Sequence, residues 1–204
     1  MNTPGGLPMF PLGSVLFPSM VLPLHIFEPR YRALIDDCLA GDREFGVTLI
    51  ERGAEVGGDD TRSNIGCIAQ VIEADQFDDG RWFVTGVGTR RFTVTEWLPD
   101  DPYPQAVVEL IEEVPAVPSD QAVFDSVVAQ LRTINEVAAQ RGVTVEALPD
   151  DLSTDAALGS FQVATLSPLG AFDRQRVLAE LTPTDRLGML EGLLSDFLHD
   201  LRAL

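Results

Sequence analysis

The sequence predicts an α+β protein: a strand-rich first half that closes into a small barrel with one helix, then a bundle of about four helices. Short apolar runs broken by prolines and glycines fill the first half, whereas longer apolar stripes at helical spacing fill the second. The segment from Glu113 to Ser119 carries two prolines and separates these patterns. We therefore predict two subdomains, residues 1-114 and 115-204.

The opening stretch predicts a strand, a second strand and a helix. Prolines cannot donate to a strand ladder, so they divide the stretch into strands over Leu12 to Phe17 and Met20 to Ile26. Pro29 instead predicts the start of a helix, because at the first helical position its missing N–H costs nothing. Gly41 lies where a left-handed residue would end that helix.

The remainder of the first half predicts a β-meander, which closes into a barrel because closure removes exposed edges. Between its first two strands, Glu51 to Asn64 has the glycines and mixed charges of an exposed loop. Its predicted strands are Phe45 to Ile50, Gly66 to Ala74, Arg81 to Val87, Arg91 to Trp97 and Gln105 to Ile111.

The second half predicts four helices with short connections. A long helix follows the N-cap Ser119 and stops at Gly142, and the last helix opens with Pro183 at its first position. Two shorter helices lie between them, over about Asp155 to Leu166 and about Phe172 to Leu181. The apolar stripes predict that the helices pack as a bundle.

Several segments together closely resemble one known family. These are PLGSVLFPSMVLPLHIFEPRYRALIDDCL with FGVTLI after it, DGRWFVTGVGTRRFTV, and SFQVATLSPLGAFDRQRVLAELTPTDRLGMLEGLL. In this order they resemble the N-terminal domain of Lon protease, the substrate-binding part of that ATP-dependent protease. The resemblance covers nearly the whole chain and implies a PUA-like β-pseudobarrel in the first half.

The basic residues set limits on enzymatic function. All 14 are arginine, and no lysine occurs. A P-loop needs its lysine to reach the phosphates, and the Lon peptidase uses a serine activated by a lysine. The chain therefore resembles the Lon substrate-binding domain standing alone, without ATPase or protease, and we expect it not to be an enzyme.

Net charge and hydropathy limit the classes of partner that we expect. The formal net charge of -18 argues against nucleic acid, because phosphate binding requires basic patches. Met1 to Phe27 contains no charged residue, but its repeated prolines and its lack of a positive start argue against a membrane helix and a signal peptide. We expect a cytoplasmic protein with no membrane partner, in which Cys38 and Cys67 are reduced thiols.

Catalytic, metal and cofactor sites find little support. The Asp-Asp pairs lack the ligand spacing of a calcium loop and are expected to be solvated. His25 is expected to be a structural histidine in a strand, and His199 an exposed residue of the last helix. Gly86-Val87-Gly88 precedes a strand instead of a helix, so it predicts a bend and no dinucleotide site. We expect no catalytic residue, metal or cofactor.

One ion pair is expected to have a structural role. Glu28 lies next to apolar residues, where an unpaired buried carboxylate would cost several kcal/mol. Arginine is the natural partner because its planar fork matches a carboxylate. We predict that Glu28 pairs with Arg91 or Arg30 and holds the first helix to the barrel.

Two functional hypotheses remain open. The resemblance implies a non-enzymatic protein- or peptide-recognition module that binds unfolded or degron-bearing polypeptides, and an adaptor for a separately encoded protease or ATPase is a variant of it. The alternative is a small-ligand or enzymatic role in a cleft between barrel and bundle. The candidate peptide-binding residues are Phe10, Phe17, His25, Phe27, Tyr31, Phe161 and Phe172.

Overall fold

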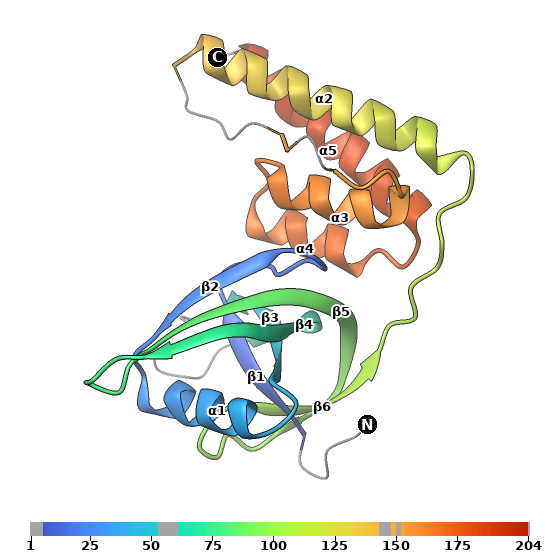
Figure 1. The fold of residues 1–204 in the computed structure, drawn as a ribbon. Coiled ribbons are helices and arrows are strands. Elements are labelled where there is room, and N and C mark those ends of the chain that lie inside the picture. Colours follow the sequence, from blue (N-terminus) through green and yellow to red (C-terminus); the bar gives the residue numbers. More distant parts are fainter. Residues whose placement is uncertain (1–5, 53–60, 143–147, 150–151, 204) are drawn as a thin grey trace. The chain divides into compact units, whose positions relative to one another are not determined.

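The computed structural model describes residues 6–52, 61–142, 148–149 and 152–203 of the 204-residue chain. It confirms the predicted α+β class, with a six-stranded sheet and five helices in the described part (Figure 1). The chain divides into two compact units, Met1–Glu112 (unit 1) and Glu113–Leu204 (unit 2). Each unit is described by itself.

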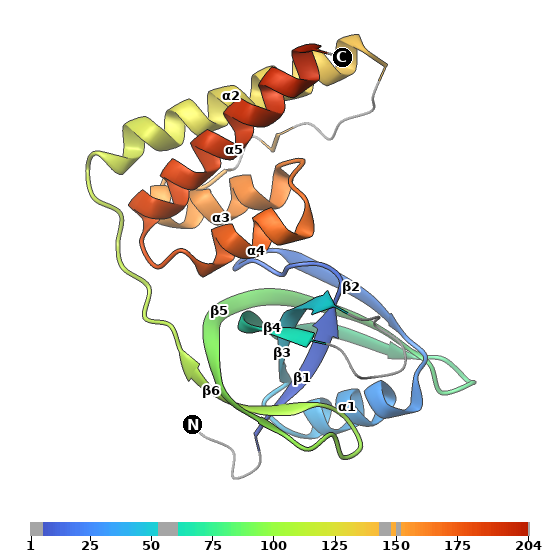
Figure 2. The ribbon, with the colours of Figure 1, turned by 180° about the vertical axis from the view of Figure 1, so that it is seen from behind.

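Unit 1 is a ring of strands with one helix. The strand order is β2-β5-β4-β3-β1-β6, and an additional pairing of β5 with β6 closes the ring (Figure 2). β2 lies outside this circuit and pairs with the first half of β5. The strands are β1 (Leu7–Leu12), β2 (Val21–Ile26), β3 (Glu44–Arg52), β4 (Thr61–Gln76), β5 (Trp82–Leu98) and β6 (Gln105–Leu110).

The first strand differs from the prediction. β1 ends at Leu12, where a strand over Leu12 to Phe17 was predicted, and it pairs in parallel with β3 despite Pro11. The apolar run that suggested the strand is buried as a loop. Its Phe17 carbonyl lies so close to Gly88 that any side chain at that position would collide with it. The run therefore fills the core without joining the ladder.

The predicted pair of strands over Arg81 to Val87 and Arg91 to Trp97 is one long strand. β5 runs through both, pairing with β2 and β4 and then with β6. Its pairing with β4 is irregular between Gly88 and Arg91, directly after Gly86-Val87-Gly88, for which the sequence predicted a bend. β4 begins at Thr61, so the end of the predicted loop is strand, and residues 53–60 of that loop lie outside the described residues.

Helix α1 (Pro29–Ala40) begins at Pro29 as predicted and buries one face in the main core of unit 1. Its end differs from the prediction, because Gly41 has φ −111°. The left-handed residue is instead Arg43 with φ 61°, whose N–H returns to the Cys38 carbonyl at 2.9 Å. The buried residues of the helix are Tyr31, Leu34, Ile35 and Cys38.

Unit 2 contains the four predicted helices, α2 (Asp120–Gln140), α3 (Ala156–Leu166), α4 (Ala171–Ala179) and α5 (Pro183–Ala203). α2 and α5 are the long pair, and Ser126 Oγ donates to Glu191 between them at 2.8 Å. The apolar stripe of α5 is buried at Leu187, Leu190 and Leu194, whereas Phe197 is half-buried.

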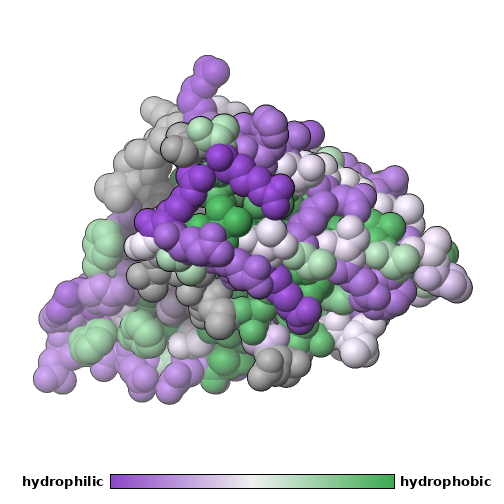
Figure 3. Space-filling model, turned by 90° about the horizontal axis from the view of Figure 1, so that it is seen from above, coloured by the Kyte–Doolittle hydropathy of each residue, from purple (hydrophilic) through white to green (hydrophobic). Residues whose placement is uncertain are grey.

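Among the described residues, each helix is too short or too polar to cross a membrane. The view from above shows hydrophilic residues interspersed with smaller groups of apolar ones (Figure 3).

Candidate functional site

Most of the predicted peptide-binding aromatics lie in hydrophobic cores. Phe10 stacks on Tyr31 with 4.1 Å between ring centroids, which joins β1 to α1. Phe17 is fully buried in the loop after β1. These three side chains are at most 8% exposed and pack inside unit 1.

In unit 2, Phe161 is also buried, and it lies against the fully buried Arg186. The guanidinium carbon is 3.7 Å from the ring centroid. Arg186 Nε donates to Ser160 Oγ at 2.7 Å, and Nη1 donates to the Glu180 carbonyl at 3.1 Å. Because the hydroxyl and the carbonyl satisfy a buried cation, this arrangement joins α3 to α5 and is structural.

The other predicted residues of unit 1, His25 and Phe27, are exposed and belong to an apolar surface on β2, β5 and the turn between β4 and β5. His25 lies opposite Phe83 in the β2–β5 ladder, and its ring meets Phe77 edge-on at 6.0 Å. Phe27 is 57% exposed. We call this the β2–β5 surface and define it by its exposed members, Val21, His25, Phe27, Ile72, Phe77 and Phe83.

The strand period explains why these side chains face outward. Leu22 and Ile26 alternate with them along β2 and enter the core under α1, together with Val84 on β5. Ile72 lies at an irregularity in the β4–β5 register and is 59% exposed. Sequence reasoning missed Phe77, Phe83 and Ile72, although the alternation along β5 already places Phe83 and Val84 on opposite faces.

The rim of the β2–β5 surface is charged. Arg81 lies 5.7 Å from the Phe77 ring centroid, and its Nε donates to Asp79 at 2.8 Å. The backbone N–H of Arg81 also donates to Asp79, and this bond is the main cause that lowers the pKa of the Asp79 carboxyl. An apolar centre with a charged rim is typical of a protein-binding surface.

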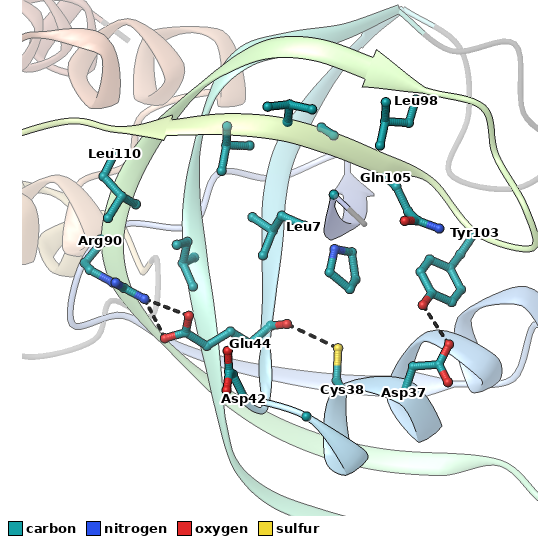
Figure 4. A pocket seen from close by; sticks show the side chains of 17 residues that line it. Leu7, Asp37, Cys38, Asp42, Glu44, Arg90, Leu98, Tyr103, Gln105 and Leu110 are labelled. Atoms are coloured by element: carbon teal, nitrogen blue, oxygen red, sulfur yellow. Dashed lines mark hydrogen bonds and ion pairs between the residues drawn. The ribbon is translucent and has the colours of Figure 1, made fainter. Parts of the chain in front are cut away.

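A second feature of unit 1 is a pocket of about 730 Å³ at one mouth of the ring (Figure 4). We call it the β6 groove, because β6 forms one wall from Gln105 to Leu110. Its apolar lining includes Leu7, Pro8, Ile68, Leu98, Ala106, Val107, Val108 and Leu110.

The opposite wall of the β6 groove is polar and comes from the end of α1 and the start of β3. Tyr103 donates to Asp37 Oδ2 at 2.7 Å, and the Cys38 thiol donates to the Glu44 carbonyl at 3.2 Å. Arg90 donates to both carboxylate oxygens of Glu44 at 2.7 Å. The sequence gave no indication that these residues meet.

The polar groups of the β6 groove are poorly suited to catalysis. Burial, and secondarily the Asp37 charge, raises the pKa of Cys38 to about 12, so the nucleophilic thiolate is strongly disfavoured. Burial and the hydrogen bond to Asp37 likewise raise the pKa of Tyr103. The groove therefore suits binding better than nucleophilic chemistry.

The predicted ion pair forms between Glu28 and Arg30 at 3.1 Å, within the first turn of α1. It joins neighbouring residues, so it does not itself attach the helix to the strands. Arg30 also lies over the Tyr31 ring at 4.5 Å, and Tyr31 makes the link to β1 through Phe10. Arg91 is fully buried on β5, opposite Cys67.

The remaining candidates of unit 2 belong to neither of the two features of unit 1. His199 is exposed on α5, and Phe172 is 64% exposed at the start of α4. Three of the Asp-Asp pairs, at residues 36-37, 78-79 and 100-101, are exposed, and the pairs at 59-60 and 150-151 lie outside the described residues. Within the described part of the chain, His, Cys, Asp and Glu form no group that could hold a metal ion.

Comparison with known families decides what this fold is. A model of the ATP-dependent protease La (LON) substrate-binding domain matches residues 6–196, which includes both units. The chain belongs to this family.

Curated relatives of the LON substrate-binding domain are much longer proteins. Lon protease 2 of Herpetosiphon aurantiacus is 29% identical over 202 residues, which are 93% of this chain and 23% of that protein. A Lon protease of Anaeromyxobacter dehalogenans is 30% identical over 151 residues, 73% of this chain and 17% of that protein. The chain thus spans about a quarter or less of these relatives.

Solved structures agree with this family. A Lon N-terminal domain protein from Xanthomonas campestris is 26% identical, with a TM-score of 0.67, and the match covers 91% of this chain and 96% of that one. The N-terminal domain of a Mycobacterium avium complex Lon protease is 20% identical, also with a TM-score of 0.67 over 94% of this chain and 98% of that one, and shows the shared fold. The LON substrate-binding domain family and its α+β fold are therefore consistent with a substrate-recognition module.

Proposed function

We propose that this chain is a non-enzymatic module that recognises unfolded polypeptides through the β2–β5 surface. The observation that carries the proposal is the cluster of exposed aromatic rings on this surface, His25, Phe27, Phe77 and Phe83, in a chain of the LON substrate-binding family.

The energetics favour apolar segments as ligands. Phe27 and Phe77 are 57% and 48% exposed, so each ring can still bury apolar area against a partner. Aromatic side chains are enriched among the residues that dominate binding free energy at interfaces. Unfolded polypeptides expose the apolar side chains that folded proteins bury, and they are the class of ligand that such a surface would select.

We further propose that the bound polypeptides include degron-bearing ones and that the chain serves as an adaptor for a separately encoded protease or ATPase. Support comes from the match, which is to a substrate-binding domain, and from the lack of lysine, which leaves no P-loop lysine and no Ser-Lys dyad in this sequence. Purified protein should therefore neither hydrolyse ATP nor cleave casein. Turnover of either at a rate that co-purifies with the protein would contradict the non-enzymatic role.

Fluorescence anisotropy tests the proposed surface. The probe is fluorescein-labelled α-lactalbumin, unfolded by reduction and carboxymethylation, titrated with the full chain. The double variant Phe77→Ser with Phe83→Ser should bind at least about tenfold more weakly, the equivalent of about 1.4 kcal/mol. Phe172→Ser is the matched control, because it removes an aromatic that is 64% exposed on α4, outside the proposed surface.

The same titration separates the alternatives. A labelled single-stranded RNA should not bind even at low salt, because the net charge of -18 repels phosphates. Equal affinity of the double variant and the Phe172→Ser control would remove the β2–β5 surface from the proposal. Failure of the native chain to bind the unfolded protein would favour the small-ligand alternative.

A further inference from the structure

Part of the outer edge of β6 carries backbone hydrogen-bonding groups that have no strand partner among the described residues. The N–H of Met9 on β1 donates to the Pro104 carbonyl at 2.8 Å, so residue 104 points toward β1. Backbone groups alternate sides along a strand, so residues 106, 108 and 110 point the same way. The N–H of Ile111 donates to Arg91 on β5 at 3.0 Å, which places the odd-numbered residues on the β5 side and agrees with this assignment.

β1 covers only the first part of that edge. Among the described residues, its pairing with β6 consists of Pro8 with Gln105 and Leu7 with Ala106. Beyond this point Val108 and Leu110 direct their N–H and C=O groups into the β6 groove, with no described strand beside them. An exposed row of such groups is a template for one more strand.

The rest of the β6 groove fits an extended chain. Side chains of an added strand alternate between two faces, and one set would meet the apolar lining that includes Leu7, Ile68 and Val108. Among the described lining residues, the rim carries the acidic side chains Asp37, Asp42 and Glu44 and one cation, Arg90, which Glu44 already binds. The Asp42 carboxylate has no ion-pair partner among the described residues. The rim is thus net acidic and complements a basic residue.

We propose that the β6 groove binds an extended segment of a polypeptide substrate as an added strand along Val108 to Leu110, and that it selects segments in which apolar residues alternate with basic ones. This inference rests on the proposed recognition of unfolded polypeptides and adds a second site and a binding mode to it. Main-chain hydrogen bonds supply affinity in this mode, and the groove lining and rim supply the side-chain preference.

Anisotropy with a matched pair of labelled nonapeptides tests the mode. Both have the sequence Lys-Val-Lys-Val-Lys-Val-Lys-Val-Lys, and in one of them every backbone amide is N-methylated, which removes the donors of both edges at unchanged charge. The native chain should bind the unmodified peptide at least about tenfold more tightly. Equal affinity of the two would overturn strand addition, since attraction to an acidic protein is the same for both peptides.

Two variants locate the site. Val108→Pro removes an N–H that points into the groove and should abolish the preference for the unmodified peptide. Asp42→Asn should weaken binding of both peptides by a few-fold and keep the preference. If Val108→Pro does not fold, the peptide pair and the Asp42→Asn variant still test the site. An unchanged affinity of Asp42→Asn would show that the acidic rim does not contribute to peptide binding.

The double variant of the β2–β5 surface distinguishes binding in the β6 groove from binding at the β2–β5 surface. Phe77→Ser with Phe83→Ser should lose affinity for unfolded α-lactalbumin and still discriminate between the nonapeptides. If that variant loses peptide discrimination as well, the peptides bind at the β2–β5 surface and the groove assignment is wrong. If neither nonapeptide binds the native chain while unfolded α-lactalbumin does, strand addition fails and the proposed function stands.

Discussion

The strands of unit 1 leave two edges without a described partner, and the two edges differ in what they offer. β2 pairs only with β5, and its middle residue Pro23 has no N–H to give to an added strand. β6 carries no proline within Gln105–Leu110 and opens onto the β6 groove. The β2 edge is protected against pairing, whereas side chains beside it form an apolar surface.

This difference indicates two modes of recognition in one sheet. On the β2–β5 surface, binding would depend on exposed aromatic rings such as Phe77 and Phe83, and the backbone would contribute little. In the β6 groove the backbone of Val108 and Leu110 would contribute the hydrogen bonds. A ligand that loses its amide donors should therefore be rejected by one site and tolerated by the other.

The largest expected effect is on the free energy of unfolding, which should fall much more when a core aromatic is truncated than when a surface aromatic is. Phe10→Ala should cost about 3–5 kcal/mol of unfolding free energy, because it leaves a cavity beside Tyr31 and Phe45. Phe77→Ala should change stability by no more than about 0.5 kcal/mol. Urea denaturation followed by tryptophan fluorescence measures unit 1 specifically, since both tryptophans, Trp82 and Trp97, lie in β5. Similar stability of the two variants would contradict the assignment of Phe10 to the core.

A second prediction concerns binding at the β2–β5 surface. Phe27→Ser should weaken binding of unfolded α-lactalbumin about five- to tenfold, roughly 1 kcal/mol, because the ring is exposed and available for burial. The affinity for the unmodified nonapeptide should stay the same, since that peptide is assigned to the β6 groove. Anisotropy titrations of this variant with both probes measure the contrast. Equal losses of affinity for the two probes would show that both bind at one site.

The pH dependence of stability reports on the wall of the β6 groove. Cys38 has a pKa raised from 9.0 to about 12 in the folded protein, so between these values the unfolded chain releases a proton that the folded chain keeps. The contribution of Cys38 to the free energy of unfolding should therefore be fully present below about pH 9. It should be lost as pH rises toward 12, with a loss of roughly 1 kcal/mol at pH 10.

Cys38→Ala provides the control for that fall. The substitution shifts stability at every pH, but it should remove roughly 1 kcal/mol of the loss between pH 8 and pH 10. Urea denaturation at both pH values, again followed by tryptophan fluorescence, gives the difference. An identical loss in native and variant protein would show that the Cys38 thiol is not shielded from solvent in the way the groove implies.

The smallest expected effect comes from unblocking the β2 edge. Pro23→Val restores an N–H on this strand and adds a good strand former. The variant should bind the unmodified nonapeptide up to about twofold more tightly, roughly 0.4 kcal/mol, through a second edge. Its preference for the unmodified peptide should persist when Val108→Pro is also present. Loss of that preference in the combined variant would show that proline is not what protects β2.

Local sequence chemistry predicted several elements well. Pro29 and the apolar spacing after it predicted α1, and Pro183 predicted the start of α5, because both depend on bonds within one helix. The same reasoning was wrong for the run before Phe17, which has the composition of a strand but is buried as a loop. Hydrophobicity alone cannot distinguish these outcomes, since both remove the same apolar surface from water.

For the candidate site residues, too, local sequence could not predict every outcome. Phe10 and Phe27 are both phenylalanines in the same opening stretch, and no local feature marks one as core and the other as surface. The difference comes from the tertiary fold, because Phe10 lies on β1 and stacks on Tyr31, whereas Phe27 follows the end of β2 and is exposed. Likewise Glu44 and Arg90 are 46 residues apart and meet because β3, β4 and β5 are neighbours in the ring.

The α+β class, the family and the helix starts could be inferred from residue identity and from neighbours within a few positions, and the lack of lysine is read directly from the sequence. In contrast, the exposure of each aromatic side chain, and the strand edge that has no described partner, became known from the three-dimensional arrangement of the strands. Those properties depend on the pairing of distant strands: among the described residues, the pairing of β1 with β6 reaches from Gln105 to Ala106, and Val108 and Leu110 line the groove.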